Sequence, residues 1–424
     1  MYQTIQDIQN RLKKNEVWRN TNFDDVLTID MQTPQKADCA PANLQCNIPN
    51  LEALRVETVN GFCQTPLHTT AEGIIVGSLR QALAEHPDLA GLIYNQTPAQ
   101  NPFKELNYQQ YSDGIFVYVP DNTTASIPIQ LLHIYNANLP IVAQSRNCIY
   151  VGNNSRLTLI HCDDSLNRQI CFGNNVTEII AGNNAVVDHY KMQNLNDVSG
   201  LNNQTYVVLD TAAHLLSVAI TLNGGHIRNH SEIIMKGSHC DVQSHGLYLN
   251  DKNQRVENYI YVDHAYPDCR SHELFKGILD DSAQGQFNGH VLVSQGASKT
   301  EAYMQNKNIL LTDKAHIYTR PFLEIYNDDV KCSHGSTIGQ IDETALFYLR
   351  SRGISEHTAK TLLLYAFCDE VIRKIQLPVL RDRLGDMVKQ RLHGDLSVCA
   401  ECALNCTSSC GCNTQEFKID PTRL

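Results

Sequence analysis

The feature that most constrains this chain is a long stretch, from about residue 113 to residue 330, in which apolar and polar residues alternate. Side chains of a β-strand point alternately to opposite faces, so alternation with a period of two predicts strands. No long pattern of helical period interrupts the stretch. We therefore predict a mainly β protein whose core spans residues 106–340. The clearest runs are GIFVYVP (114–120), SIPIQLLHIY (126–135), NCIYVGNNSRLTLIHC (147–162), NVTEIIAGNNAVVDHY (175–190) and QTYVVLDTAAHLLSVAITL (204–222).

Turn residues within this stretch are compatible with two architectures. Gly-Asn-Asn occurs at 152–154, 173–175 and 182–184. Antiparallel hairpins use Asn- and Gly-rich turns, and a parallel β-helix uses the same residues at the corners of its coils. The first two copies lie 21 residues apart, close to one coil, but the third follows after only 9. The spacing favours a solenoid slightly and leaves a sandwich open.

Helical patterns flank the β core on both sides. Residues 2–15 and 71–86 have apolar residues at spacings of three and four, which predicts two helices in a mixed amino-terminal region, residues 1–105. Its single tryptophan, Trp18, is interpreted as a packing anchor. After the core, Asp342 and Ser355 are good N-caps and Pro378 is a good first helical residue. We predict three helices in a carboxy-terminal domain, residues 341–398.

A short stretch at the end of the β core combines several chemically active side chains. In EIYNDDVKCSHG (324–335), residues 323–330 are predicted to form a strand, which would place Asp328, Val330, Cys332 and His334 on one face. A thiol and an imidazole on one face are suitable soft metal ligands. They are equally suitable as a nucleophile and its base.

Composition excludes some classes of function. The formal net charge of −11 argues against a nucleic-acid surface. No run of 18 apolar residues would span a membrane, and the first residues lack the apolar core of a signal peptide. We therefore expect a cytoplasmic protein, in which the 15 cysteines are thiols or metal ligands rather than disulfides.

We predict structural roles for most of these cysteines and for a group of histidines. Ten cysteines are scattered from Cys39 to Cys368, and except for Cys332 we expect them in the core. Seven histidines between residues 223 and 300 are expected to be mainly exposed or hydrogen-bonded in coil, since none has the spacing of a zinc helix.

A cysteine-rich tail, residues 399–424, follows the predicted helices. Its five cysteines fall within fourteen residues, and thiolates at such spacing are able to close a four-thiolate site for zinc or an iron–sulfur cluster. A redox-active or disordered tail is the alternative. The candidate ligands are Cys399, Cys402, Cys406, Cys410 and Cys412.

Two uninterrupted strings, EIYNDDVKCSHGSTIGQID (324–342) and LFYLRSRGI (346–354), resemble the SufB/SufD family of iron–sulfur cluster assembly proteins, and its SufD members in particular. The segment KNEVWRNTNFDDVL (14–27) resembles the family's entry segment. The resemblance covers most of residues 10–395, but not the cysteine-rich tail. It implies a right-handed parallel β-helix with helical ends.

The resemblance also implies partners and roles. It implies a SufB-like subunit that pairs through the end of the β-helix, and a SufC-like ATPase that docks on the carboxy-terminal helices. Cys332 and His334 match family positions at the subunit interface, where they would hold a nascent iron–sulfur cluster transiently. We assign ATPase docking to Leu346, Tyr348, Leu363 and Phe367. Self-association of the isolated chain is a further expectation.

The resemblance implies a non-catalytic scaffold, and other functions would need sequence features of their own. Neither a Walker A motif nor G-x-G-x-x-G is present in the sequence, so we expect no P-loop ATP site and no Rossmann-type cofactor site in this chain. A carbohydrate-active β-helix enzyme would need paired acids, for which Asp163 and Asp164 are candidates, although adjacent strand residues point to opposite faces. A thiol-rich metal-binding protein acting through its tail is the remaining alternative.

Overall fold

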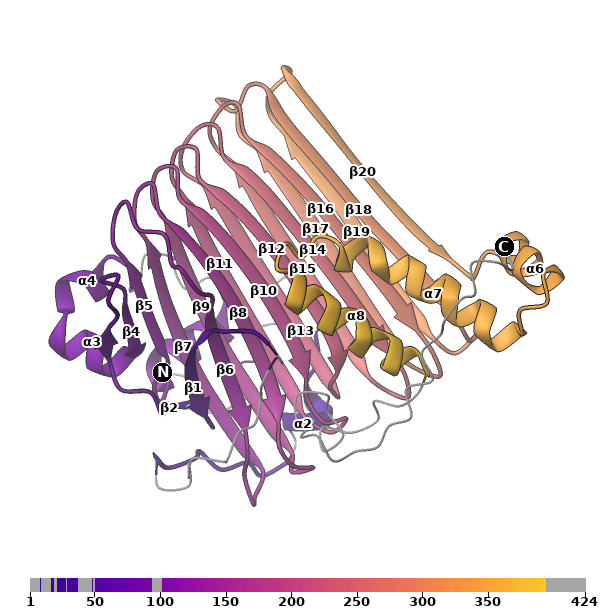
Figure 1. The fold of residues 1–424 in the computed structure, drawn as a ribbon, viewed down its shortest axis with the longest axis horizontal. Helices are drawn as coiled ribbons and strands as arrows, with labels where there is room; N and C mark the ends of the chain where they lie inside the picture. The colour runs from indigo at the N-terminus through magenta and orange to yellow at the C-terminus, as the bar shows by residue number, and fades with distance from the viewer. Residues whose placement is uncertain are drawn as a thin grey trace.

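The structure, a computed structural model, describes residues 8, 17–18, 21–27, 29–36, 48, 50–93 and 101–393. It is a parallel β-solenoid of about 8 turns, built from two facing ten-stranded sheets (Figure 1). The first sheet has the order β2 (Phe62–Cys63), β1 (Leu54–Val59), β6 (Ile129–Tyr135), β8 (Arg156–Ser165), β10 (Val186–Asn194), β12 (His214–Asn223), β14 (Asp241–Asn250), β16 (Arg270–Leu279), β18 (Thr300–Leu310) and β20 (Val330–Gly339). The second has the order β19 (His316–Ile325), β17 (Gln284–Val293), β15 (Arg255–His264), β13 (His226–Met235), β11 (Gly200–Leu209), β9 (Cys171–Ala181), β7 (Ile141–Val151), β5 (Ile115–Val119), β4 (Ile75–Ser78) and β3 (His68–Thr69).

Equivalent residues of successive coils stack in register. Arg156 pairs with Val186, 30 residues further on, and Val186 pairs with His214 after another 28. Side chains that point inward stack into a continuous apolar column, which includes Leu157, Val187, Leu215 and Val242. The parallel solenoid is therefore the correct choice between the two predicted architectures, and the hairpins found among the described residues lie near the beginning of the chain.

The corners explain why the Gly-Asn-Asn spacing was misleading. The copies at 152–154 and 182–184 occupy equivalent corners one coil apart, where Asn154 and Asn184 both have positive φ angles. The Asn184 side-chain amide donates to Asn154 Oδ1 at 3.0 Å, which extends a ladder of asparagines along the corner. The copy at 173–175 lies inside β9. The coil is thus the 30-residue interval between the first and third copies, and the 21-residue interval has no structural meaning.

The amino-terminal elements close the first coil. Among the described residues of this region there are four helices: α2 (Asp24–Leu27), α3 (Leu79–Glu85), α4 (Pro87–Gly91) and α5 (Pro102–Gln110). The predicted helix over 71–86 is wrong in its first half, because Ile75–Ser78 forms β4 and pairs antiparallel with β5. Ser78 then caps α3 by accepting from the backbone N–H of Gln81. Of the predicted helix over 2–15, all residues except Ile8 lie outside the described part of the chain.

A segment around Trp18 covers the outer face of the second sheet. Trp18 is 1% exposed, which confirms its predicted role as a packing anchor, and its indole lies against Arg228 of β13 at 3.9 Å. Arg228 donates to Glu257 of β15 at 2.6 Å, and Glu257 accepts from Thr21 at the same distance. This polar latch fixes the segment to the middle of the sheet.

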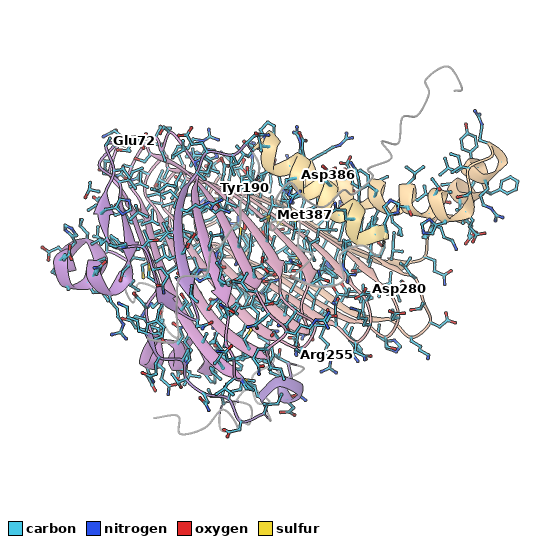
Figure 2. All side chains as sticks on the ribbon, turned by 60° about the horizontal axis from the view of Figure 1, so that its bottom comes forward. Glu72, Tyr190, Arg255, Asp280, Asp386 and Met387 are labelled. Atoms are coloured by element: carbon cyan, nitrogen blue, oxygen red, sulfur yellow. The ribbon has the colours of Figure 1, made fainter. Side chains whose placement is uncertain are left out.

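The carboxy-terminal helices agree closely with the sequence. They are α6 (Glu343–Ser351), α7 (Glu356–Ile372) and α8 (Pro378–His393), with Asp342 and Ser355 as the N-caps of the first two. The helices α7 and α8 share an apolar cluster with the outer face of the first sheet, to which Tyr190 of β10 and Met387 of α8 belong (Figure 2). Arg391 of α8 also donates to Asp251 Oδ2 at 2.6 Å. By contrast, α6 lies at the far end of the molecule, beyond β20 (Figure 1).

Candidate functional site

The last coil of the solenoid leaves an open end. In the described part of the chain, β19 and β20 are the final strands of the two sheets, and each has a strand neighbour on one side only. Such edges present backbone N–H and C=O groups that are ready to pair with another strand. Large apolar side chains are exposed on these strands and on the turn between them: Tyr318, Phe322, Ile325, Tyr326 and Ile338. An open edge with exposed apolar side chains is typical of an interface.

Cys332 lies on β20 and stacks on Ala302 of β18. It is half-buried and packs against the inner apolar column. Burial raises the pKa of the Cys332 thiol, and the nearby Glu273 carboxyl acts in the same direction. Glu273 is itself buried inside the solenoid, where desolvation raises its pKa to about 8. The thiol is therefore protonated at neutral pH in the isolated chain.

His334 follows two residues later on the same face of β20 and is exposed. It stacks on Met304, which in turn stacks on Glu273. The predicted pairing of Cys332 and His334 on one strand face therefore agrees with the structure, and both lie at the open end. No group of three or more metal-ligating side chains occurs among the described residues. A metal or cluster held here would need ligands beyond these two.

The predicted strand over residues 323–330 needs correction. The strand β19 ends at Ile325 and β20 begins at Val330, because the side chain of Asn327 accepts from the backbone N–H of Asp329 and forms a turn. Asp328 and Asp329 lie in this turn. Since His334 is five residues further along β20, roughly 16 Å at the rise of a strand, these aspartates do not orient its ring.

The predicted docking residues fall into two groups. Leu346 is buried, and Phe367 is half-buried under the Lys276 ammonium, which lies 4.3 Å from its ring. Leu363 is half-buried, whereas Tyr348 is 56% exposed. The sequence interpretation missed Phe347, at 73% exposed, and Leu362. Helical periodicity would have identified Phe347 as an exposed residue, because Phe347 points away from the apolar stripe that includes Leu346.

Burial was also predicted for the scattered cysteines, and exposure or hydrogen bonding for the histidines between residues 223 and 300. Among the described residues, the scattered cysteines other than Cys332 are buried, as predicted: Cys63, Cys148, Cys162, Cys171, Cys240, Cys269 and Cys368. The expectation of exposed histidines is wrong for four of the seven, which lie buried within strands: His226, His230, His245 and His264. The ring of Phe23 packs on His226 and that of Trp18 on His230. Three of the four are hydrogen-bonded, as the expectation allowed, with the side-chain partners Glu257 for His226, Glu232 for His230 and Ser271 for His264.

The remaining predicted site residues are two candidate acids and the cysteines of the tail. Asp163 and Asp164, the candidate acids of a carbohydrate-active enzyme, are both buried, and Asp163 accepts from the side-chain amides of Asn175 and Asn203 inside the solenoid. The predicted tail ligands, from Cys399 to Cys412, lie outside the described residues. Within the described residues, no helix is both long and apolar enough to cross a membrane.

Comparison with known proteins identifies the family. The family model described as the SufBD core domain of the SUF system for FeS cluster assembly matches residues 133–367, and the model of the SufBD amino-terminal region matches residues 2–131. The chain belongs to the SufB/SufD family. It is 32% identical to the iron–sulfur cluster assembly protein SufD of Escherichia coli, over 90% of this chain and 89% of that protein.

Two further relatives belong to the same family. An iron–sulfur cluster assembly SufBD family protein of Synechocystis is 30% identical over 89% of this chain and 87% of its own length. The SufD protein of Bacillus subtilis is 26% identical over 78% of each chain. Together with the solenoid, these matches assign this SufB/SufD protein to iron–sulfur cluster assembly.

Proposed function

We propose that this chain is the SufD-like, non-catalytic scaffold subunit of a cytoplasmic SufBCD-type complex. It pairs with a SufB-like subunit through the open end of the solenoid, and a SufC-like ATPase docks on its carboxy-terminal helices. The observation that carries the proposal is the open end formed by β19 and β20, which have a strand neighbour on one side only in the described part of the chain. Cys332 and His334 both lie on β20. In the absence of its partner, the same edge would accept a second copy of this chain.

The nascent cluster is the cargo of this interface. Cys332 and His334 supply a thiolate and a neutral imidazole, both of which suit iron, and the partner subunit supplies the remaining ligands. A thiol must lose its proton to bind metal, and burial of Cys332 opposes that loss. A rearrangement that exposes Cys332 to water therefore favours cluster binding, and ATP hydrolysis in the docked subunit would drive it.

We place ATPase docking on the exposed apolar face of the carboxy-terminal helices. The exposed apolar side chains of these helices are Phe347 and Tyr348 of α6 and Leu362 of α7. Exposed aromatic side chains of this kind are common anchors of protein interfaces. Leu346, Leu363 and Phe367, the other predicted docking residues, would support these exposed side chains from beneath.

His334 provides the test of the assembly site. In the complex co-expressed with SufB-like and SufC-like subunits, His334→Ala should reduce bound iron and sulfide about tenfold or more, since even groups that only orient a metal ligand matter at that level. The complex itself should elute unchanged in size-exclusion chromatography. His316→Ala is the matched control, because His316 is an exposed histidine on the neighbouring edge strand. A normal cluster content in His334→Ala would refute the proposed role.

The cysteine-rich tail supports a second, separable site. Five cysteines in residues 399–412 suit zinc or a cluster. Termination of the chain after Val398 should remove the metal held by the tail and leave the iron that depends on His334. Metal analysis of both chains by mass spectrometry distinguishes the sites, and full retention of metal after truncation would exclude the tail.

A further inference from the structure

Two cysteines stack directly on each other at one corner of the solenoid. Cys240 precedes β14 and Cys269 precedes β16, and the next residues, Asp241 and Arg270, pair in register. The backbone N–H of Arg270 donates to the Cys240 carbonyl at 2.9 Å, which fixes the two coils at this corner. Neighbouring strands lie about 4.8 Å apart. That separation falls within the range of Cα–Cα distances that a disulfide spans.

Hydrogen bonds bring the two sulfur atoms together and make them unequal. Both sulfur atoms lie 3.3 Å from the carbonyl oxygen of Gly237. A hydrogen bond from the Cys240 thiol lowers the pKa of Cys269 and raises that of Cys240. This hydrogen bond favours the thiolate form of Cys269, beside which the Cys240 thiol lies.

A surface groove of about 620 Å³ passes over this corner. Cys240 lines it together with His239, Asp241, Asp268 and Arg270. Cys240 and Cys269 are 1% and 0% exposed, so only a small reagent would reach them from the groove without unfolding of the corner. Hydrogen peroxide is close to water in size.

We propose that Cys240 and Cys269 form a dithiol site that hydrogen peroxide closes to a disulfide between adjacent coils. The Cys269 thiolate attacks one peroxide oxygen, the O–O bond breaks, and hydroxide leaves and takes a proton to form water. The resulting sulfenic acid is attacked by the Cys240 sulfur. The S–S bond forms, and the sulfenic hydroxyl leaves as water with the thiol proton. Two thiols and one peroxide thus give one disulfide and two waters.

The alternative is that both thiols only fill space. Ala185 and Ala213 occupy the equivalent positions of the two preceding coils, so this corner accepts small side chains. The same fact supplies the control variants, because Cys240→Ala and Cys269→Ala reproduce a side chain that the corner already holds.

Peptide mapping of the full chain tests the proposal. After peroxide treatment and alkylation of the remaining thiols, trypsin yields residues 237–252 and 256–270, each with one cysteine. We expect these two peptides to be recovered as a linked pair that dithiothreitol separates. The Tm of the oxidised chain should rise, because the disulfide closes a loop that restricts the unfolded state. Cys240→Ala should instead accumulate sulfenic acid at Cys269, detected with dimedone.

Two results would overturn the proposal. One is the absence of the linked pair while thiols elsewhere in the chain become oxidised. The other is the same yield of the pair in urea-unfolded chain, which would show that the native corner does not favour it. Neither result bears on the subunit interface, because the corner thiols are not part of β19 or β20.

Discussion

The two ends of the solenoid are built in opposite ways. At the beginning, β1 and β4 each pair antiparallel with a short strand, and the helices α3 and α4 pack against β4. At the end, β19 and β20 are left with one neighbour each in the described chain, and apolar side chains such as Tyr318 are exposed. The coils between them repeat the same stacking, so the ends differ only in what covers them.

The outer face of the second sheet shows the same contrast. The segment around Trp18 and Phe23 covers it from β9 to β15, through contacts with Phe172 and Arg228. Further along the same face, Phe322 of β19 is exposed. An edge strand that no other element covers keeps its backbone groups available for association with another chain. The first end is thus closed by the chain itself and the last end is open, and it is the open end that the proposed function gives to a partner.

The largest expected effect concerns the latch that holds the cover. Burial opposes ionisation of Glu257, but its hydrogen bond with His226 and the charge of Arg228 outweigh that cost and lower its pKa to about 2. The Glu257 carboxyl therefore stays ionised in the folded state at a pH where the same carboxyl in the unfolded chain already carries a proton. Its contribution is therefore complete above about pH 4.5 and is lost as the pH falls toward about 2, at most about 3 kcal/mol.

Fluorescence of Trp18 measures this loss, because it is the only tryptophan and its indole contacts Arg228. We expect a shift of emission to longer wavelength as the pH falls from about 4.5 to about 2. Glu257→Gln should show the shifted emission already at neutral pH, since it leaves Arg228 buried without its anion. If the cover opens at the same pH in wild type and variant, another group controls it.

The next effect concerns the open end. Ile338→Lys replaces the exposed apolar side chain of β20 by a charge and should weaken pairing with the SufB-like subunit by about 2 kcal/mol, roughly thirtyfold. Binding is measured by titration with the purified partner. Leu139→Lys is the control, because Leu139 is similarly exposed in the connection between β6 and β7. Equal affinity of both variants would mean that the open end is not the interface.

The smallest effect separates docking from packing in the helical domain. Phe347→Asp should weaken binding of the SufC-like ATPase by about tenfold and leave thermal stability unchanged, because Phe347 is exposed. Phe367→Ala should do the reverse, since it removes packing beneath Lys276. Pull-down and thermal melts of both variants give the answer. A loss of stability in Phe347→Asp with normal binding would reject this division.

Much of the fold could be predicted because its signals are local. Alternation identified the strands, and the capping side chains of Asp342 and Ser355 identified where α6 and α7 begin. The length of a coil could not be read from Gly-Asn-Asn, because the copy at 173–175 is drawn into β9, where Asn175 donates to Asp163 inside the solenoid. Likewise, the apolar pattern of residues 75–78 fits a helix and a strand, and pairing with β5 decided between them.

The same distinction between local and tertiary information applies to the candidate site. Its residue types and their spacing on one strand face were determined by the sequence alone, since alternation along a strand depends only on the local backbone. Tertiary structure decided that Cys332 is half-buried and His334 exposed, and that Phe367 faces the solenoid while Phe347 faces solvent. Burial depends on what stacks about 30 residues away along the chain or packs from another element, and no local pattern records that neighbour.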